Sequence, residues 1–318
     1  MKTRFVIWSQ LFLFSFLMVF CSDSSNPVND NNQNEPTAGN EFGLIAYCRQ
    51  PGGSGRHQIY KISEFGTNDV RMIQASIGLN HQDWSPDGQK IACVGYVETD
   101  FSTWSIHTFN PNGSELTRLT NTEGVWDNDP RWSSDGTQIA FTRIYPNDTI
   151  REEIWVMNSD GSNLHYIGVK GNVGGWSPDG LRLLYSAISL GNSDIYSCNI
   201  DGSDILQITN TSENEECPTY SPDGSQIVFS SFWGSMSNHE IEIMNSDGTN
   251  RRALTENDSF DSNPRWSPDG LKLVFVSDRH EFHQWEIYTM KTDGTDVRRV
   301  TLSQAPATAI NPVWRPSL

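Results

Sequence analysis

Short apolar runs separated by polar turns recur along the chain. Six runs of this kind are Ile45–Tyr47, Ile91–Cys93, Ile139–Phe141, Leu183–Tyr185, Ile227–Phe229 and Leu273–Phe275. Apolar runs this short, bounded by turn residues, are typical of buried β-strands rather than helices. The pattern therefore predicts an all-β chain.

A second set of strands follows the first at a fixed offset. Each begins at an isoleucine and is followed by a glycine seven residues later; the isoleucines are Ile59, Ile106, Ile154, Ile195, Ile241 and Ile287. Glycine and Asx residues favour tight turns. A further short strand, such as Leu116–Leu119 or Val297–Val300, comes after this turn. With a strand ahead of the first apolar run, each repeat has four strands.

An aromatic residue followed by a tight turn marks the end of the first strand of each repeat. The repeat residues are Trp84, Asp87 and Gly88; Trp132, Asp135 and Gly136; Trp176, Asp179 and Gly180; Tyr220, Asp223 and Gly224; Trp266, Asp269 and Gly270; and Trp314. Proline at the second turn position presets φ, and glycine at the last accepts a positive φ. Aromatic residues repeating every 44 to 48 positions indicate a propeller.

The repeats predict a six-bladed β-propeller of four-stranded blades. The first repeat lacks its first strand, and Asn311–Trp314 at the other end of the chain supplies a matching segment. We therefore expect strands from both ends to share one blade and close the ring. Closure leaves few exposed sheet edges.

The repeat also carries a family resemblance. The segments Asn263–Gly270 and Ile287–Thr301 show the pattern most fully, and it resembles the propeller repeats of the TolB family over residues 44–315. It is similar, too, to the propellers of prolyl-oligopeptidase-type peptidases. The printed sequence leaves no room for the α/β domain that precedes the TolB propeller, so we expect a propeller that stands alone. The resemblance implies a protein that holds other proteins.

The first residues have the pattern of a targeting segment. Lys2 and Arg4 precede an apolar run, Phe5–Phe20, that ends at Cys21. The pattern resembles a bacterial lipoprotein signal, which predicts a signal peptide over residues 1–21 and lipidation at Cys21; an ordinary cleaved signal and an uncleaved anchor are the alternatives. Residues 22–41 are polar and predict a disordered linker ahead of a propeller over residues 42–318. We expect a bacterial cell-envelope location, anchored by lipid and facing the periplasm or exterior.

The charge balance limits the partners. The formal net charge is −17, and clustered Lys and Arg are what nucleic acid binding requires. We therefore expect no nucleic acid partner.

Irregular loops carry the candidate binding residues. In a four-stranded antiparallel blade, the loops between the second and third strands and between blades share one face, and here these loops are long and dissimilar. Three of them, Thr120–Asp129, Asn210–Glu216 and Glu256–Ser262, hold acids and no Lys or Arg. The candidate binding residues are Asp127, Asp129, Glu215, Glu216, Asp258, Asp261, His81, His239, His283, Trp126 and Trp233, with Phe260 and Phe282 as further anchors.

These residues predict an acidic channel mouth that binds a basic segment of a partner protein. Two alternatives stay open. The acids can serve only to keep the protein soluble, or they can coordinate a divalent cation at the channel mouth.

The sequence favours binding over catalysis. It contains no G-x-S-x-G nucleophile elbow and no C-x-x-C pair, and we expect Cys48, Cys93, Cys198 and Cys217 to be buried, inert thiols. We expect no catalytic residue, no resident metal and no cofactor. The alternative is a propeller-type lyase or hydrolase acting on a carbohydrate with a metal held by His and carboxylate residues, which His280–His283 would permit.

Overall fold

The computed structural model describes residues 43–50, 56–97, 100–147, 151–189, 191–233, 239–303 and 307–317. The expected signal peptide over residues 1–21, its lipidation site Cys21 and the linker over residues 22–41 lie outside these ranges. Within the ranges, no helix long and apolar enough to span a membrane is found.

The described residues form strands and turns without a helix, which confirms the all-β class. The first twelve strands are β1 (Leu44–Arg49), β2 (Gln58–Ser63), β3 (Val70–Arg71), β4 (Gly78–Trp84), β5 (Ile91–Val97), β6 (Asp100–Phe109), β7 (Thr117–Arg118), β8 (Trp126–Trp132), β9 (Gln138–Tyr145), β10 (Arg151–Asn158), β11 (His165–Lys170) and β12 (Asn172–Trp176). The others are β13 (Arg182–Ser189), β14 (Asn192–Asn199), β15 (Leu206–Gln207), β16 (Asn214–Tyr220), β17 (Gln226–Phe232), β18 (His239–Asn245), β19 (Arg252–Ala253), β20 (Asp261–Trp266), β21 (Lys272–Ser277), β22 (Glu286–Lys291), β23 (Arg298–Arg299) and β24 (Ala309–Trp314).

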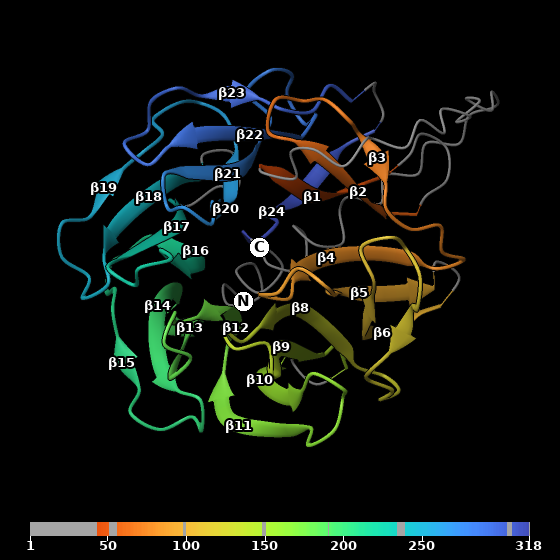
Figure 1. Cartoon of the computed structure of the whole chain (residues 1–318). Helices are drawn as coiled ribbons and strands as arrows, with labels where there is room; N and C mark the ends of the chain where they lie inside the picture. The colour runs from red at the N-terminus through yellow and green to blue at the C-terminus, as the bar shows by residue number, and fades with distance from the viewer. Residues whose placement is uncertain are drawn as a thin grey trace.

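Antiparallel pairing groups the strands in fours. Four sheets have the orders β24-β1-β2-β3, β12-β13-β14-β15, β16-β17-β18-β19 and β20-β21-β22-β23. The remaining eight strands form two groups, β4–β7 and β8–β11, which one parallel bridge between Trp104 and Trp126 joins into a single sheet. Figure 1 shows the groups arranged around a central axis, with β4, β8, β12, β16, β20 and β24 nearest to it. We call these six the inner strands.

The turn after each of the first five inner strands is stabilised locally. In the first of them, the amide of Gly88 donates to the carbonyl of Ser85 at 2.8 Å, and Ser85 Oγ donates to Asp87 Oδ1 at 2.6 Å. The same two bonds recur in the turns that begin at Ser133, Ser177, Ser221 and Ser267. Because every bond joins residues within four positions, the repeated sequence alone determines this turn.

Neighbouring groups contact each other through the repeat residues. Trp176 Nε1 donates to the carbonyl of Arg131, on the preceding inner strand, at 3.0 Å. Gly202 has a φ of 79°, and a Cβ there would lie 1.8 Å from the carbonyl oxygen of Ile167 in the preceding group. A Cβ at Gly66 would likewise lie 2.7 Å from the carbonyl oxygen of Val300 in the last group. The first and last groups are therefore in contact.

Strand β24 joins the two ends of the described chain. It pairs with β1, with Trp314 opposite Ile45 and Ala309 opposite Arg49. Ala309 and Trp314 are buried in one apolar cluster that also contains Ile45 and Val300. The C-terminal strand therefore belongs to the same sheet and the same core as the N-terminal strand.

Candidate functional site

Each inner strand carries a β-bulge before its closing aromatic residue. The register of β4 with β5 shifts between Asn80 and Asp83, and equivalent shifts occur in the other inner strands. A bulge leaves one residue unpaired and re-aims its side chain. The repeated bulge thus turns one residue of each inner strand away from the regular pleat.

Five of these bulges hold a non-glycine residue in the left-handed region. They are His81, Asp129, Cys217, Asn263 and Asn311, with φ between 48° and 54°. Asn, Asp and His are the residue types most enriched in this region. All five side chains line one central cavity of about 170 Å³. The bulges therefore supply the ring of side chains that surrounds the axis.

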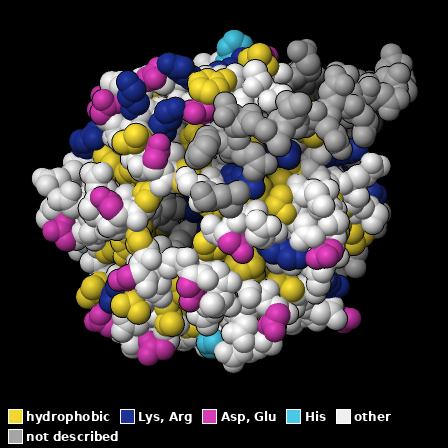
Figure 2. All heavy atoms as spheres, viewed as in Figure 1, with side chains coloured by type: hydrophobic (Ala, Val, Ile, Leu, Met, Phe, Trp, Pro, Cys, Tyr) yellow, Lys and Arg dark blue, Asp and Glu magenta, His cyan; other side chains and the backbone are white. Residues whose placement is uncertain are grey.

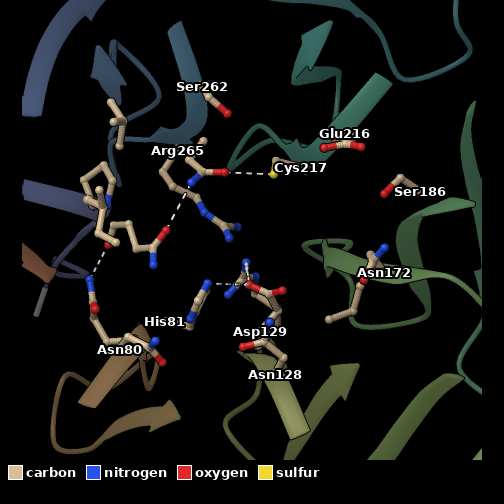
Figure 3. Close-up of a pocket in the computed structure, with 18 of the residues that line it drawn as sticks. Asn80, His81, Asn128, Asp129, Asn172, Ser186, Glu216, Cys217, Ser262 and Arg265 are labelled. Atoms are coloured by element: carbon tan, nitrogen blue, oxygen red, sulfur yellow. Dashed lines mark hydrogen bonds and ion pairs between the residues drawn. The ribbon is translucent and has the colours of Figure 1, made fainter. Parts of the chain in front are cut away.

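The cavity lies where the inner strands meet. Figure 3 shows His81 and Asp129 on one side of it, and Glu216, Ser186 and Asn172 along another. Its walls also include Ile144, Glu152 and Val276, which lie at or near the strand ends that lead into the irregular loops. The cavity therefore opens toward the face that carries these loops, which we call the variable face.

Aromatic rings form two walls of the cavity. Trp104 stacks on Trp126 with ring centroids 5.2 Å apart. On the other wall, His239 lies 4.2 Å from Phe260, which lies 5.8 Å from Trp285. All five rings line the cavity. Aromatic rings supply large, rigid contact surfaces at low entropic cost, and they are enriched among the anchors of protein interfaces.

Two arginines and three carboxylates line the polar part. Arg131 Nε donates to the carbonyl of Gly174 at 2.9 Å, and Arg265 Nη1 donates to the same oxygen at 3.2 Å. Arg131 Nη2 also lies 3.5 Å from Asp129 Oδ1. Burial, and then repulsion by Arg131, lower the pKa of Arg265 to about 10. The other two lining carboxylates are Glu152 and Glu216.

Glu152 has a strongly altered acidity. Burial is the largest cause, and repulsion by Glu216 and Asp129 adds to it, while the hydrogen bond from Asn172 opposes it; together they raise the pKa of Glu152 to about 7. Asn172 Nδ2 donates to Glu152 Oε2 at 2.8 Å. A positive charge placed beside this group would favour its ionised form.

Several polar atoms around the cavity have no hydrogen-bond partner within the described ranges. They include Asn80 Oδ1, Asn128 Oδ1 and both ring nitrogens of His239. Asn128 and His239 are each 1% exposed. Buried polar groups without partners are costly and are normally satisfied by protein, water or a ligand. The cavity therefore offers unused hydrogen-bonding atoms between aromatic walls.

The comparisons with known proteins identify this architecture. The family model of the TolB beta propeller domain matches residues 40–230 and 175–317. The chain belongs to the TolB β-propeller family.

Two solved structures share the fold of this TolB-like propeller. TolB from Acinetobacter baumannii matches with a TM-score of 0.73 and 21% identity, over 86% of this chain and 67% of that one. The putative TolB from Agrobacterium tumefaciens matches with a TM-score of 0.67 and 22% identity, over 86% and 95%.

Curated relatives match shorter stretches. An uncharacterized protein of Agrobacterium fabrum is 28% identical over 181 residues, 55% of this chain and 59% of that protein. A TolB homolog of Chlorobaculum tepidum is 36% identical over 53 residues, 17% of this chain and 12% of that protein. The chain therefore spans less than two thirds of the length of these relatives.

Six of the predicted binding and anchor residues of the propeller meet at the cavity. They are His81, Trp126, Asp129, Glu216, His239 and Phe260. They come from strands and strand ends that the turns and bulges bring together around the axis.

Three predicted acids lie elsewhere, and this corrects the expected acidic mouth. Asp127, Glu215 and Asp261 are 0% exposed. Each is paired with an arginine of a neighbouring segment: Arg143, Arg251 and Arg279 lie 2.6, 2.7 and 2.7 Å away, respectively. These carboxylates therefore present no free negative charge to a partner.

The surface agrees with this correction. On the face seen in Figure 2, Asp and Glu side chains are scattered among Lys and Arg rather than gathered in one acidic patch. The three acid-rich segments themselves hold no Lys or Arg, but Arg143 of β9, Arg251 between β18 and β19 and Arg279 just after β21 reach their acids.

The remaining candidates, Asp258, His283, Trp233 and Phe282, lie outside the cavity lining. Asp258 and His283 are exposed, and Trp233 is 63% exposed. In the part of the chain that the structure describes, no group of three or more His, Cys, Asp or Glu side chains is placed to hold a metal ion.

Sequence reasoning missed several lining residues. Asn263 and Asn311 stand three positions before their aromatic residues, as His81 and Asp129 do, so the repeat alignment could have found them. Cys217 stands at this same position; it was expected to be a buried, inert thiol, and it is partly buried and lines the cavity, where burial raises its pKa to about 12.

Glu152, Arg131 and Arg265 were missed for different reasons. The two arginines directly precede a repeat aromatic, a position that also holds Asp, Gly, Thr and Val. No local pattern singles out Glu152, because its importance comes from neighbours on other strands.

The buried histidines predict acid sensitivity. Burial lowers the pKa of His239 to about 3, and burial and His81 lower that of His57 to about 4. The unfolded chain therefore binds more protons than the folded one below the ordinary histidine pKa, so stability is complete above about pH 6.5 and falls as the pH falls from there. Each histidine should cost about 2 kcal/mol of unfolding free energy at pH 5.

The His239→Phe variant tests this directly, because phenylalanine keeps the stack on Phe232 and Phe260. Urea unfolding at pH 7 and pH 5 should show a smaller loss of stability in the variant than in the wild type, by about 2 kcal/mol. His165→Gln, at an exposed position of β11, is the matched control. Equal pH dependence of wild type and His239→Phe would contradict the assignment.

Proposed function

We propose that this chain is a protein-binding propeller. A partner protein docks on the variable face and inserts a side chain into the central cavity. The main support for this proposal is the cavity. Its aromatic walls enclose buried polar atoms, such as Asn128 Oδ1 and the His239 ring nitrogens, that have no hydrogen-bond partner within the described ranges. These atoms are already desolvated in the free protein. A group that forms hydrogen bonds with them would therefore gain those bonds without a further cost of removing water from the protein atoms.

The size of the cavity supports one anchoring group rather than a long segment. Its volume is about 170 Å³. Buried cavities of about 150 Å³ hold a benzene-sized molecule. One side chain fits, while the rest of the partner would lie on the loops outside. Interfaces in which one buried anchor dominates are common among protein complexes.

The proposal includes a closed ring of six blades. The four-stranded groups number six when β4–β7 and β8–β11 are taken separately. Pairing of β24 with β1 and the contact between Gly66 and the carbonyl of Val300 support closure between the ends. A closed ring fixes the distances between cavity residues that come from different blades.

We further propose that the protein works in the cell envelope, anchored by lipid at Cys21. The support is the sequence pattern, in which Lys2 and Arg4 precede the apolar run Phe5–Phe20 that ends at this cysteine. A Cys21→Ser variant that still partitions into the membrane fraction as the wild type does would contradict the anchor.

Blocking the cavity should strongly reduce partner capture. Ile144 is half-buried at the end of β9 and lines the cavity, so Ile144→Arg would fill the opening without removing core side chains. In pull-downs from an envelope extract of the source organism, capture of the partner should fall by about tenfold or more, as expected for the loss of a central anchor.

The matched control is Leu271→Arg. Leu271 is 65% exposed and follows the turn at Gly270, on the face opposite the variable face. This variant should capture the partner as the wild type does. Equal capture by both variants and the wild type would show that the cavity takes no part in binding.

A further inference from the structure

The cavity has one acidic side, and its construction can be followed strand by strand. In the strand register, Trp126 lies opposite Ile144, and Ile144 lies opposite Glu152. Residues directly opposite each other in antiparallel strands share one face of the sheet. Asn172 then bonds to Glu152 and lies opposite Ser186. A continuous row thus leads from an indole ring to a carboxylate along one wall.

The carboxylate end of this row is reinforced from other strands. Glu216 lines the same side as Ser186 and Asn172 (Figure 3). Asp129 also acts on Glu152 electrostatically. The two lining arginines donate to the carbonyl of Gly174, and both interact electrostatically with Asp83. Three lining carboxylates therefore face two guanidinium groups that are already engaged.

The unused polar atoms are suited to a donor-rich group. Asn80 Oδ1 and Asn128 Oδ1 are acceptors without a partner within the described ranges, and a neutral His239 ring offers one acceptor nitrogen. A guanidinium has five N–H donors and no acceptor, and an ammonium has three. Cations also bind favourably over the faces of indole rings such as those of Trp104 and Trp126.

We propose that the cavity is the receptor for a single lysine- or arginine-type side chain of the partner, with its apolar stem against the Trp104–Trp126 wall and its cationic end at Glu152. This assignment rests on the proposed function and names the chemistry of its anchoring group. The cavity volume of about 170 Å³ is enough for one such side chain.

A pair of small probes tests the charge requirement. The n-butylguanidinium ion carries the arginine side chain with one further carbon in the place of Cα, and n-butylurea has the same shape without the charge. Calorimetric titration of the purified chain should show n-butylguanidinium binding about tenfold or more tightly than n-butylurea, because only the cation gains from the carboxylates. Equal affinity for the two probes would overturn the proposal.

Substitution then locates the charge. Glu152→Gln should remove most of the preference for the cation, since the amide keeps the shape and loses the charge. Glu123→Gln is the matched control, because Glu123 is exposed in a loop of the same face and does not line the cavity. If Glu152→Gln kept the preference for n-butylguanidinium over n-butylurea, or if Glu123→Gln lost it to the same extent, the placement of the cationic end at Glu152 would be contradicted.

A pH titration provides a readout that a purely structural role of Glu152 would not move. The groups around Glu152 from the elements packed against it are Asp129 and Arg131 of β8, Ile144 of β9, Asn172 of β12 and Glu216 of β16, whereas Lys170 of β11 lies opposite Glu153, whose side chain points to the other face of the strand. Since the pKa of Glu152 is about 7, wild-type affinity for n-butylguanidinium should rise between about pH 6 and about pH 8. The rise should be absent in Glu152→Gln.

Competition separates this inference from the proposed function. Saturating n-butylguanidinium should displace the captured partner from the wild type, and n-butylurea should not. If the partner binds and depends on Ile144 but the cation neither binds nor displaces it, the cationic anchor is wrong and the binding function stands. If capture is also insensitive to Ile144→Arg, the proposed function itself fails.

Discussion

The Arg143→Met variant is expected to lose about 3–5 kcal/mol of unfolding free energy. Arg143 makes two hydrogen bonds to Asp127, at 2.6 and 2.9 Å, and the guanidinium lies 4.4 Å from the Trp155 ring centroid. Asp127 is 0% exposed, so removing its partner leaves a buried charge without compensation. Urea unfolding of the purified protein measures the loss.

The double variant Asp127→Asn, Arg143→Met should recover much of this stability, because neither position then carries a charge. The control is Arg298→Met, because Arg298 forms an exposed ion pair with Asp296. Loss of this surface pair should barely change the unfolding midpoint. If the single variant were as stable as the wild type, or the double variant no better than the single one, Asp127 would not depend on Arg143.

Deleting the chain after Thr308 should destabilise the protein by at least about 5 kcal/mol. The deletion removes β24, including Ala309 and Trp314, from the apolar cluster and from their pairing with β1. Truncating one buried tryptophan alone costs about 3–5 kcal/mol, and the newly exposed edge of β1 adds the cost of unpaired backbone groups.

Chemical denaturation and near-ultraviolet circular dichroism would measure this loss. A control that lacks only residues 316–318 keeps β24 and should unfold at the wild-type midpoint. A synthetic peptide of residues 307–318 should restore part of the stability of the truncated chain by pairing with β1. An unchanged midpoint after the long deletion would contradict closure of the ring by β24.

The buried ion pairs and the pairing of β24 with β1 also shape the site. Ion pairs such as Arg143 with Asp127 neutralise the loop acids inside the blades, so the charge available to a partner is that of the cavity residues. Pairing of β24 brings Asn311 into the cavity lining beside residues of the other inner strands. A stability defect in either feature should therefore also weaken binding at the cavity.

Much of the fold could be predicted from the sequence, because the deciding interactions are local. The turn at Ser85, Asp87 and Gly88 is stabilised by bonds within four residues, and the sequence repeats it at a regular interval. The match between the first repeat and Asn311–Trp314 predicted the pairing of the C-terminal strand with the N-terminal one, which the register of β1 with β24 shows.

The site was predicted only in part. His81 and Asp129 were found because they stand in the repeat next to irregular loops, and both line the cavity. Asp127, two positions from Asp129, was assigned to the same surface, yet it is buried. The difference arises at the bulge, where an extra residue in β8 re-aims Asp129 toward the axis.

What the sequence by itself determined is the repeated unit: its strands, its turns and the position of its aromatic residue. Those depend on φ preferences and hydrogen bonds between near neighbours. What only the tertiary structure decided is the state of each charge. Glu215 is neutralised by Arg251 from the segment between β18 and β19, and burial, together with repulsion by Glu216 and Asp129 of two other strands, raises the pKa of Glu152. Electrostatic interactions in a buried site depend on distances in space, which the order of residues along the chain does not specify.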